Sequence, residues 1–173
     1  MMEVLAPARD HDCLLAALRA GADAVYFGLH DWNARARAQN FDPSELEPTL
    51  RLLHSHGRKG YLALNTLVFD HELEALADAV RLAADAGVDA LLVQDLGVAR
   101  LAREIAPGLR LHASTQMTCT DAGSVAFAGS LGVRRVVLAR ELSLLDIAAI
   151  RESTDLELEV FVHGALCIAY SGQ

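Results

Sequence analysis

One pattern occurs three times along this chain: a helix-like stretch ends in a glycine, and a short apolar run that contains valine follows. It is found at residues 20–28, 86–94 and 131–139. The glycine suits the left-handed backbone that ends many helices. The apolar run suits a strand buried on both faces, as in a parallel sheet. The repeated alternation therefore predicts an α/β architecture with right-handed crossovers.

Extended to the whole chain, the pattern predicts seven strands and six helices. Strands are expected near 3–7, 24–28, 60–65, 90–94, 109–113, 134–139 and 158–163, and helices near 11–20, 44–56, 71–86, 96–105, 118–131 and 144–152. Asp42-Pro43-Ser44-Glu45, Asp70 and Ser143 are typical helix starts. The short, even spacing, without a glycine-rich phosphate loop, favours an incomplete (β/α) TIM-type barrel over an open doubly wound sheet.

Composition and charge restrict the class of protein. With 173 residues, of which 53% are hydrophobic, the chain is expected to form a single domain over 1–173. It has no apolar run long enough for a membrane span and no signal-peptide pattern, so a cytoplasmic protein is expected. The net charge of −8 argues against RNA binding by this segment alone. Three widely spaced cysteines are not a disulfide framework.

Polar residues follow nearly every predicted strand. In a β/α barrel the carboxyl ends of the strands meet at one rim, where the active site lies, so these residues predict a polar pocket. The candidate site residues are Asn33, Arg35, Asn65, Gln94, His112, Arg140, Glu141, His163 and Cys167.

Most of these residues also have a purely structural interpretation. Asn65 could satisfy backbone groups of a loop, and Gln94 with the next residue could cap a helix. Arg140 and Glu141 could form an ion pair across the rim or bind an anion. His112 and His163 could be hydrogen-bonding residues, or acid–base groups that converge at one mouth.

The cysteines divide by position. Cys167 follows a glycine at a strand end and could be a nucleophile, a metal ligand or a small buried residue. Cys13 and Cys119 fall on predicted helices and are expected in the core. The sequence contains no Cys-x-x-Cys, Walker, dinucleotide-binding, zinc-protease or Gly-x-Ser-x-Gly motif.

The segment from Glu159 to Gln173 resembles the signature of the collagenase-like peptidase family U32. Further matching segments run through the whole chain, at residues 5–8, 21–28, 33–36, 64–67, 93–97, 112–116 and 138–143. The resemblance implies the N-terminal part of the family's barrel, and the chain is expected to stop inside the signature motif.

What the resemblance implies about activity has two branches. Some family members are described as collagenase-like peptidases. Others hydroxylate an RNA pyrimidine or a ubiquinone precursor and carry an iron–sulfur cluster on four cysteines. Cys167 matches the first of those cysteines, and the next is expected just beyond Gln173. A 4Fe–4S cluster is thus expected in a longer parent protein, and this chain alone is expected to be metal-free and inactive.

The elements around residues 112–116 and 163–173 are most similar to the RNA-hydroxylating branch. By that resemblance the substrate is a tRNA or rRNA pyrimidine. Asn33, Asn65, Gln94 and His112 would contact the base, Arg35 and Arg140 would hold anionic groups, and Glu141, His163 or His112 would move protons. The alternatives are a peptidase with Cys167 and His163 as nucleophile and base, or an inactive folding unit whose open barrel edges favour dimerisation.

Overall fold

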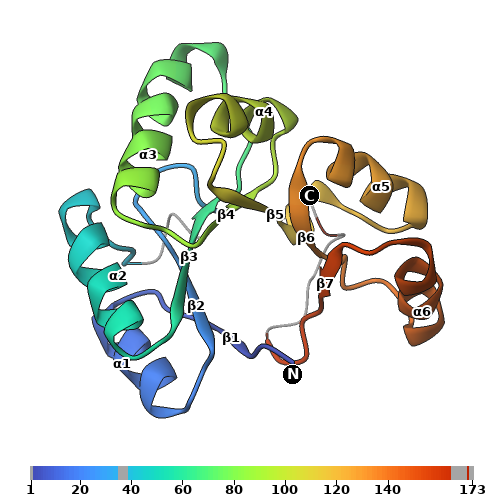
Figure 1. Ribbon diagram of the computed structural model, residues 1–173, viewed down its shortest axis with the longest axis horizontal. Coiled ribbons are helices and arrows are strands. Elements are labelled where there is room, and N and C mark those ends of the chain that lie inside the picture. The colour runs from blue at the N-terminus through green and yellow to red at the C-terminus, as the bar shows by residue number, and fades with distance from the viewer. Residues whose placement is uncertain (1, 35–38, 165–170, 172–173) are drawn as a thin grey trace.

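In the part of the chain that the structure describes, seven parallel strands lie side by side in chain order and curl around a common centre, with helices outside them (Figure 1). This computed structural model describes residues 2–34, 39–164 and 171. Its strands are β1 (Leu5–Pro7), β2 (Ala24–Gly28), β3 (Lys59–Leu64), β4 (Ala90–Val93), β5 (Arg110–Ala113), β6 (Val133–Val137) and β7 (Glu157–Glu159). A doubly wound sheet reverses its strand order and is covered on both faces. The unreversed order confirms the incomplete (β/α) barrel instead.

The helices cover only the outer face of the curled sheet (Figure 1). Those of the described residues are α1 (His11–Arg19), α2 (Leu46–Ser55), α3 (Leu73–Asp85), α4 (Leu96–Ile105), α5 (Ala122–Ser130) and α6 (Leu144–Ser153). Gly21, Gly87 and Gly132 follow α1, α3 and α5 with φ of 84°, 82° and 87°. This left-handed backbone is costly for other residues. It confirms the prediction that the recurring glycine ends a helix.

Two of the predicted helix starts are confirmed. The Asp42 carboxylate accepts a hydrogen bond from the Ser44 N–H, and the Asp42 N–H donates to Glu45, which opens the short turn Pro43–Glu45 before α2. At α6 the Ser143 hydroxyl accepts from the Asp146 N–H. Each cap satisfies backbone N–H groups that have no partner inside their own helix.

Two other helix boundaries were predicted wrongly. Asp70 does not cap α3: a 3₁₀ turn over Asp70–Glu72 precedes the helix, and the backbone N–H of Phe69 donates to Glu72. The fifth helix starts at Ala122 rather than at 118, because Asp121 is its cap. Cys119 therefore lies in the segment before α5 and not on a helix, although it is buried as expected.

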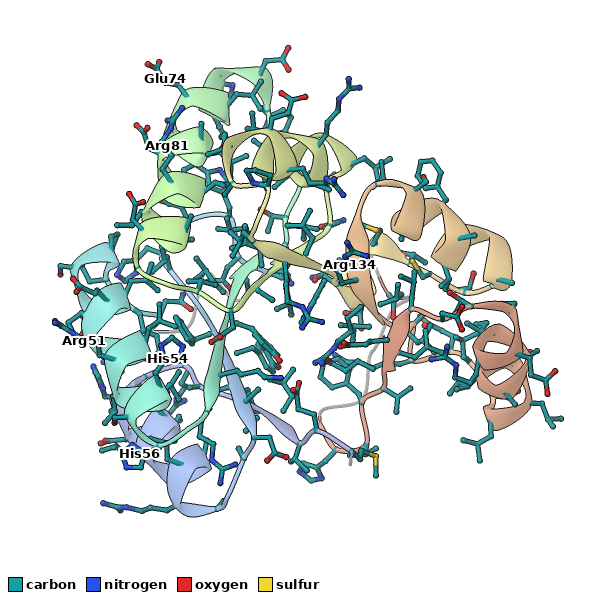
Figure 2. All side chains as sticks on the ribbon, in the orientation of Figure 1. Arg51, His54, His56, Glu74, Arg81 and Arg134 are labelled. Carbon is teal, nitrogen blue, oxygen red and sulfur yellow. The ribbon has the colours of Figure 1, made fainter. Side chains whose placement is uncertain are left out.

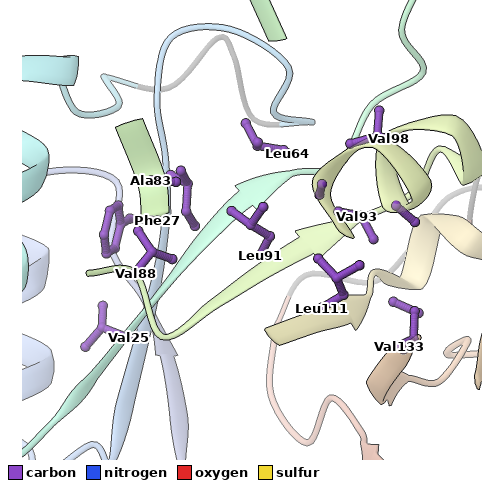
Figure 3. Close-up of a cluster of buried hydrophobic side chains, with 14 of the residues drawn as sticks. Val25, Phe27, Leu64, Ala83, Val88, Leu91, Val93, Val98, Leu111 and Val133 are labelled. Carbon is purple, nitrogen blue, oxygen red and sulfur yellow. The ribbon is translucent and has the colours of Figure 1, made fainter. Parts of the chain in front are cut away.

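The sheet separates two hydrophobic layers. The larger layer fills the space between the strands and the helices and includes Phe27, Leu64, Leu91 and Leu111 (Figure 3). A smaller cluster inside the barrel is made by Ala24, Tyr61, Ala90 and Leu92. Successive residues of a strand point to opposite faces, so β2, β3 and β4 each contribute buried residues to both layers. This accounts for the continuous apolar runs of the sequence.

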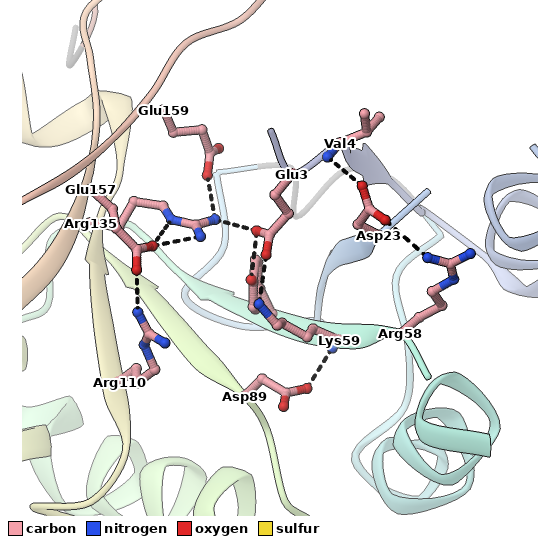
Figure 4. A network of polar contacts seen from close by, with 12 residues as sticks. Glu3, Val4, Asp23, Arg58, Lys59, Asp89, Arg110, Arg135, Glu157 and Glu159 are labelled. Carbon is pink, nitrogen blue, oxygen red and sulfur yellow. Dashed lines mark hydrogen bonds and ion pairs between the residues drawn. The ribbon is translucent and has the colours of Figure 1, made fainter. Parts of the chain in front are cut away.

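An ionic network crosses the amino-terminal end of the barrel (Figure 4). The Arg135 guanidinium on β6 contacts Glu157 at 2.7 Å, Glu3 at 2.5 Å and Glu159 at 3.3 Å, and its side chain is only 11% exposed. The Tyr61 hydroxyl donates to Glu3 at 2.8 Å. Because Glu3 precedes β1, this network joins the two ends of the sheet, which do not pair with each other in the described residues.

Charged side chains cover the outer faces of the helices. Figure 2 shows Arg51 on α2 and Glu74 and Arg81 on α3 directed away from the barrel, and all three are exposed. Among residues 2–34, 39–164 and 171, no helix is both long enough and apolar enough to cross a membrane.

Candidate functional site

A cavity of about 220 Å³ lies at the carboxyl ends of the strands, where the pocket was predicted. Its floor is formed by inward-facing strand residues such as Ala63, Leu92 and Val137. Its walls are polar, and come from the segments that follow the strands: Arg9, Asn33, Asn40, Asn65, Ser114, Thr115, Gln116 and Arg140. Three predicted site residues, Asn33, Asn65 and Arg140, are thus brought together.

Asn65 connects three segments of the cavity wall. Its Oδ1 accepts from the Ala34 N–H at 3.0 Å, and its Nδ2 donates to Ser114 Oγ at 3.1 Å and to Gln116 Oε1 at 2.7 Å. The Ser114 hydroxyl in turn donates to Gln116 Oε1 at 2.9 Å. The structural interpretation of Asn65 is therefore correct, because its amide holds loop backbone while it also lines the cavity.

Asn33 is buried in the wall beside the end of β2. Its Nδ2 donates to the Leu29 carbonyl at 2.6 Å and to Asn40 Oδ1 at 3.1 Å. Gly28 lies directly against this amide, and a Cβ at Gly28 would overlap it. The glycine is thus required for the close approach of the loop to the strand, a need that the sequence pattern alone did not reveal.

Arg140 lines the cavity together with Phe161. Its guanidinium carbon lies 4.3 Å from the centre of the Phe161 ring, within the range of a cation–π contact. The residue is exposed, and its backbone N–H donates to Ser171 Oγ at 3.4 Å. Arg140 and Phe161 together present a positive charge and an aromatic ring at the rim.

Glu141 is bound to Ser171 rather than placed in the cavity lining. Its carboxylate accepts from the Ser171 backbone N–H and, at 3.0 Å, from the Ser171 hydroxyl. The bond from that backbone N–H is the main cause that lowers the pKa of Glu141. Ser171 belongs to the signature segment, so Glu141 anchors this segment to the end of β6. Its predicted role in proton transfer stays a prediction.

His112 lies on β5 and is not part of the cavity lining. It is 1% exposed, its ring meets that of Tyr61 edge-on at 4.9 Å, and neither ring nitrogen has a hydrogen-bond partner within the described residues. Burial, followed by the positive charge of Arg135, lowers the pKa of His112 to about 3. The imidazole is therefore neutral at physiological pH, and its predicted contact with the substrate is not seen in the cavity lining.

Glu159 lines the cavity, although it was not among the predicted site residues. Its side chain is 18% exposed and pairs with Arg135. Burial raises the pKa of Glu159, and the charge of Arg135 only partly offsets this effect. A carboxyl group with a raised pKa in a pocket is a candidate acid or base. The signal for it was the end of the seventh strand, which lies at Glu159 rather than at His163.

The remaining predicted residues lie elsewhere. Gln94 follows β4, is half-buried and is not part of the cavity lining, while the next residue, Asp95, caps α4 as the structural interpretation expected. His163 is exposed, four positions past the end of β7. Arg35 and Cys167 fall outside the described residues, so their predicted roles stay predictions.

Residues 2–34, 39–164 and 171 contain no group of three or more His, Cys, Asp or Glu side chains that could hold a metal ion. Cys119 is buried, and burial, followed by the charge of Asp121, raises the pKa of its thiol to about 11. Such a thiol is protonated at neutral pH and is a poor metal ligand.

The family model for peptidase family U32 matches residues 9–173. The chain belongs to peptidase family U32. This confirms the family resemblance drawn from the strand-end motifs and the C-terminal signature.

Proteins that are similar to this chain carry different names. A 23S rRNA 5-hydroxycytidine synthase of Escherichia coli is 44% identical over 99% of the chain. A tRNA hydroxylation protein of Bacillus subtilis is 37% identical, and a collagenase of Porphyromonas gingivalis is 34% identical, each over 99% of the chain. The chain spans 26%, 40% and 44% of the length of these three relatives, respectively.

A solved structure of a U32 peptidase has the same fold as the chain. It superposes with a TM-score of 0.78, covering 92% of this chain and 68% of the other, at 15% sequence identity. At this identity the likeness concerns the fold alone, and it agrees with the incomplete barrel seen here.

Proposed function

We propose that the full-length U32 protein containing this chain hydroxylates a pyrimidine base of tRNA or rRNA in the cytoplasm. The observation that carries the proposal is the small polar cavity at the carboxyl ends of the strands. Its volume of about 220 Å³ is below the range of about 300–1,000 Å³ that is usual for drug-sized ligands. Such a cavity suits a single nucleobase better than an extended peptide.

Two named relatives support an RNA substrate, one named for hydroxycytidine in rRNA and one for tRNA hydroxylation. To enter a cavity of this kind, a base must leave its stack. The amide and hydroxyl groups of Asn33, Ser114 and Gln116 are suited to the polar edges of a base, and Arg140 with Phe161 to a phosphate or ring at the rim. Asn65 holds Ser114 and Gln116 in place.

The net charge of −8 requires a further source of RNA affinity. Phosphate neutralisation by Lys and Arg supplies most of the affinity of nucleic-acid-binding proteins. Arg9 and Arg140 line the cavity, but they are few against this negative charge. We therefore propose that basic surface from outside this chain holds the rest of the RNA.

An iron–sulfur cluster in the full-length protein is also proposed, on the family resemblance of Cys167 alone. Such clusters are held by cysteine thiolates, usually four. The described residues do not fit this requirement, because Cys119 is a buried thiol and Cys13 lies in α1. Iron and sulfide content, measured anaerobically on the full-length protein and on its Cys167→Ala variant, tests the assignment.

A peptidase is the second candidate, favoured by the name of the collagenase relative. The described residues offer it little support. A serine nucleophile needs a base within hydrogen-bonding distance. The Ser114 hydroxyl donates to Gln116 instead, and the ring nitrogens of His112 have no partner in the described residues.

Nucleoside analysis tests the proposal. The gene is deleted, total tRNA and rRNA are digested to nucleosides, and hydroxylated cytidine and uridine are measured by mass spectrometry. Loss of one hydroxylated pyrimidine on deletion, and its return when the gene is supplied again, is expected. Unchanged hydroxylated nucleosides, together with collagen cleavage by the purified protein, would favour the peptidase.

A further inference from the structure

The hydrogen bonds around Asn65 determine which end of the neighbouring Gln116 amide is already hydrogen-bonded within the protein. The starting point is the backbone N–H of Ala34, which can only donate. It lies 3.0 Å from the Asn65 side-chain oxygen, so that atom must be the acceptor Oδ1. The amide of Asn65 is therefore fixed in orientation by a group whose role is not ambiguous, whereas side-chain amides are otherwise easily assigned the wrong way round.

The fixed orientation of the Asn65 amide also determines the orientation of the Gln116 amide. With its oxygen committed to Ala34, Asn65 turns both hydrogens of Nδ2 toward Ser114 Oγ and Gln116. The Gln116 atom facing them must accept, and it accepts a second bond from the Ser114 hydroxyl at 2.9 Å. That atom is therefore Oε1, with two donors aimed at it.

The other end of the Gln116 amide is left for a ligand. Gln116 is half-buried and lines the cavity, and its Nε2 makes no hydrogen bond within the described residues. We propose that the Gln116 Nε2 group donates a hydrogen bond to a carbonyl oxygen of the substrate, and that Asn65 acts as the positioning residue that holds it in this orientation. The proposal rests on the function proposed above and names the group of the base that is recognised.

The chemistry of pyrimidines makes this contact selective. O2 is a carbonyl oxygen in both uracil and cytosine, whereas position 4 carries an accepting oxygen in uracil and a donating amine in cytosine. A fixed donor is compatible with either oxygen and not with the cytosine amine. If the bound base has no oxygen facing Gln116 Nε2, this donor is buried in the complex without a partner. That costs about 1–3 kcal/mol, or about a 5- to 150-fold effect.

Three substitutions separate the role of the donor from that of the fold. Gln116→Glu keeps an oxygen for Asn65 and Ser114 but puts an acceptor where the donor was. Gln116→Met removes both ends, and Asn65→Asp removes the donor that orients Gln116. Gln39→Glu, on an exposed residue, controls for the added charge. Each variant is expressed as the full-length protein in cells lacking the gene, and the rate at which hydroxylated pyrimidine appears in total RNA is measured after induction.

Gln116→Glu and Gln116→Met are expected to be at least about fivefold slower than the unmodified protein, and Gln39→Glu unchanged. Asn65→Asp is expected to slow the reaction by itself but to add little in the Gln116→Met background, because it acts through Gln116. Gln116→Glu at the normal rate would overturn the donor role. Additive effects of the Asn65 and Gln116 substitutions would overturn the positioning role.

A second measurement needs no catalysis, and so separates this inference from the proposed function. Exchange of the side-chain amide hydrogens with solvent is followed by NMR in the substrate-free protein. The Asn65 Nδ2 hydrogens are expected to be protected and those of Gln116 Nε2 to exchange rapidly. Protected Gln116 hydrogens would overturn the orientation. If the amide hydrogens of Asn65 and Gln116 exchange as expected but the protein hydroxylates no pyrimidine, the proposed function alone is overturned.

Discussion

At the scale of single residues, the most unusual group is His112. An imidazole whose two nitrogens have no partner in the described residues is an expensive side chain to bury. It is tolerated because burial and Arg135 keep it neutral, with its pKa near 3. In the unfolded chain the same group has a pKa near 6.5. Between these two values the unfolded state binds more protons than the folded state, so stability falls as the pH is lowered.

Replacing His112 with leucine is therefore expected to remove part of the acid sensitivity of the fold. For the unmodified protein, the histidine should lower the free energy of unfolding by about 2 kcal/mol between pH 7 and pH 5. In His112→Leu this loss should be absent. Urea unfolding of both proteins at the two pH values measures it. An equal loss in both proteins would show that another group titrates.

Gly28 is the second residue with a clear expectation. An alanine there must push the Asn33 amide away from the strand, which should cost about 1–3 kcal/mol. Gly108 is the matched control, because a Cβ there meets nothing within 4 Å. Thermal unfolding of Gly28→Ala and Gly108→Ala compares the two. Equal stability of the two variants would contradict the close approach.

At the scale of elements, a single substitution can test how much a helix cap contributes to stability. Removal of the Ser143 hydroxyl leaves the Asp146 N–H in the first turn of α6 without this partner, and caps of this kind contribute about 0.5–2 kcal/mol. Ser143→Ala is expected to speed amide hydrogen exchange in α6 and to lower the free energy of unfolding by about 1 kcal/mol. Ser130→Ala, at the last residue of α5, is the control. Similar effects of both substitutions would argue against the cap.

Features of the elements that depend on residues close together in the chain could be predicted from the sequence. Gly21, Gly87 and Ser143 act within a few residues of the chain, and their signals were interpreted correctly. The end of β7 was placed at residue 163 instead of Glu159. That difference put His163 at the rim and missed Glu159. The bonds of Asn65 to Ser114 and Gln116 join residues 49 and 51 positions apart, and no local pattern predicts them.

At the scale of the whole molecule, the ionic network joins parts of the barrel that are distant in sequence. Burial by itself raises the pKa of Glu3, but hydrogen bonds from Arg135, Lys59 and Tyr61 outweigh it and bring the pKa to about 2. A carboxylate with a depressed pKa stabilises the fold above its unfolded value of about 4.5. That stabilisation is lost as the pH falls from there toward 2.

Glu3→Gln is therefore expected to be less stable than the unmodified protein at pH 7, and the difference should shrink as the pH approaches 2. Thermal unfolding at pH 7, 4 and 2.5 shows the trend. A difference that stays constant over this range would mean that Glu3 is not the titrating partner of Arg135.

Arg135→Met is the complementary change. It leaves Glu3, Glu157 and Glu159 close together without their shared cation. Breaking a buried ion pair on one side typically costs about 3–5 kcal/mol. Urea unfolding at pH 7 measures the loss, and a second substitution, Glu3→Gln, is expected to recover part of it. A loss below about 1 kcal/mol would contradict the burial of the network.

The pairing of Glu3 with Arg135 also has a consequence for synthesis. The two residues are 132 positions apart, and a ribosome that adds about 5–20 residues per second needs roughly 7–26 s to pass from one to the other. During that time the first strand is outside the ribosome without the partner that joins it to the far side of the barrel. The nascent chain is therefore exposed to aggregation at its beginning, and chaperones that act early in translation should affect its yield most.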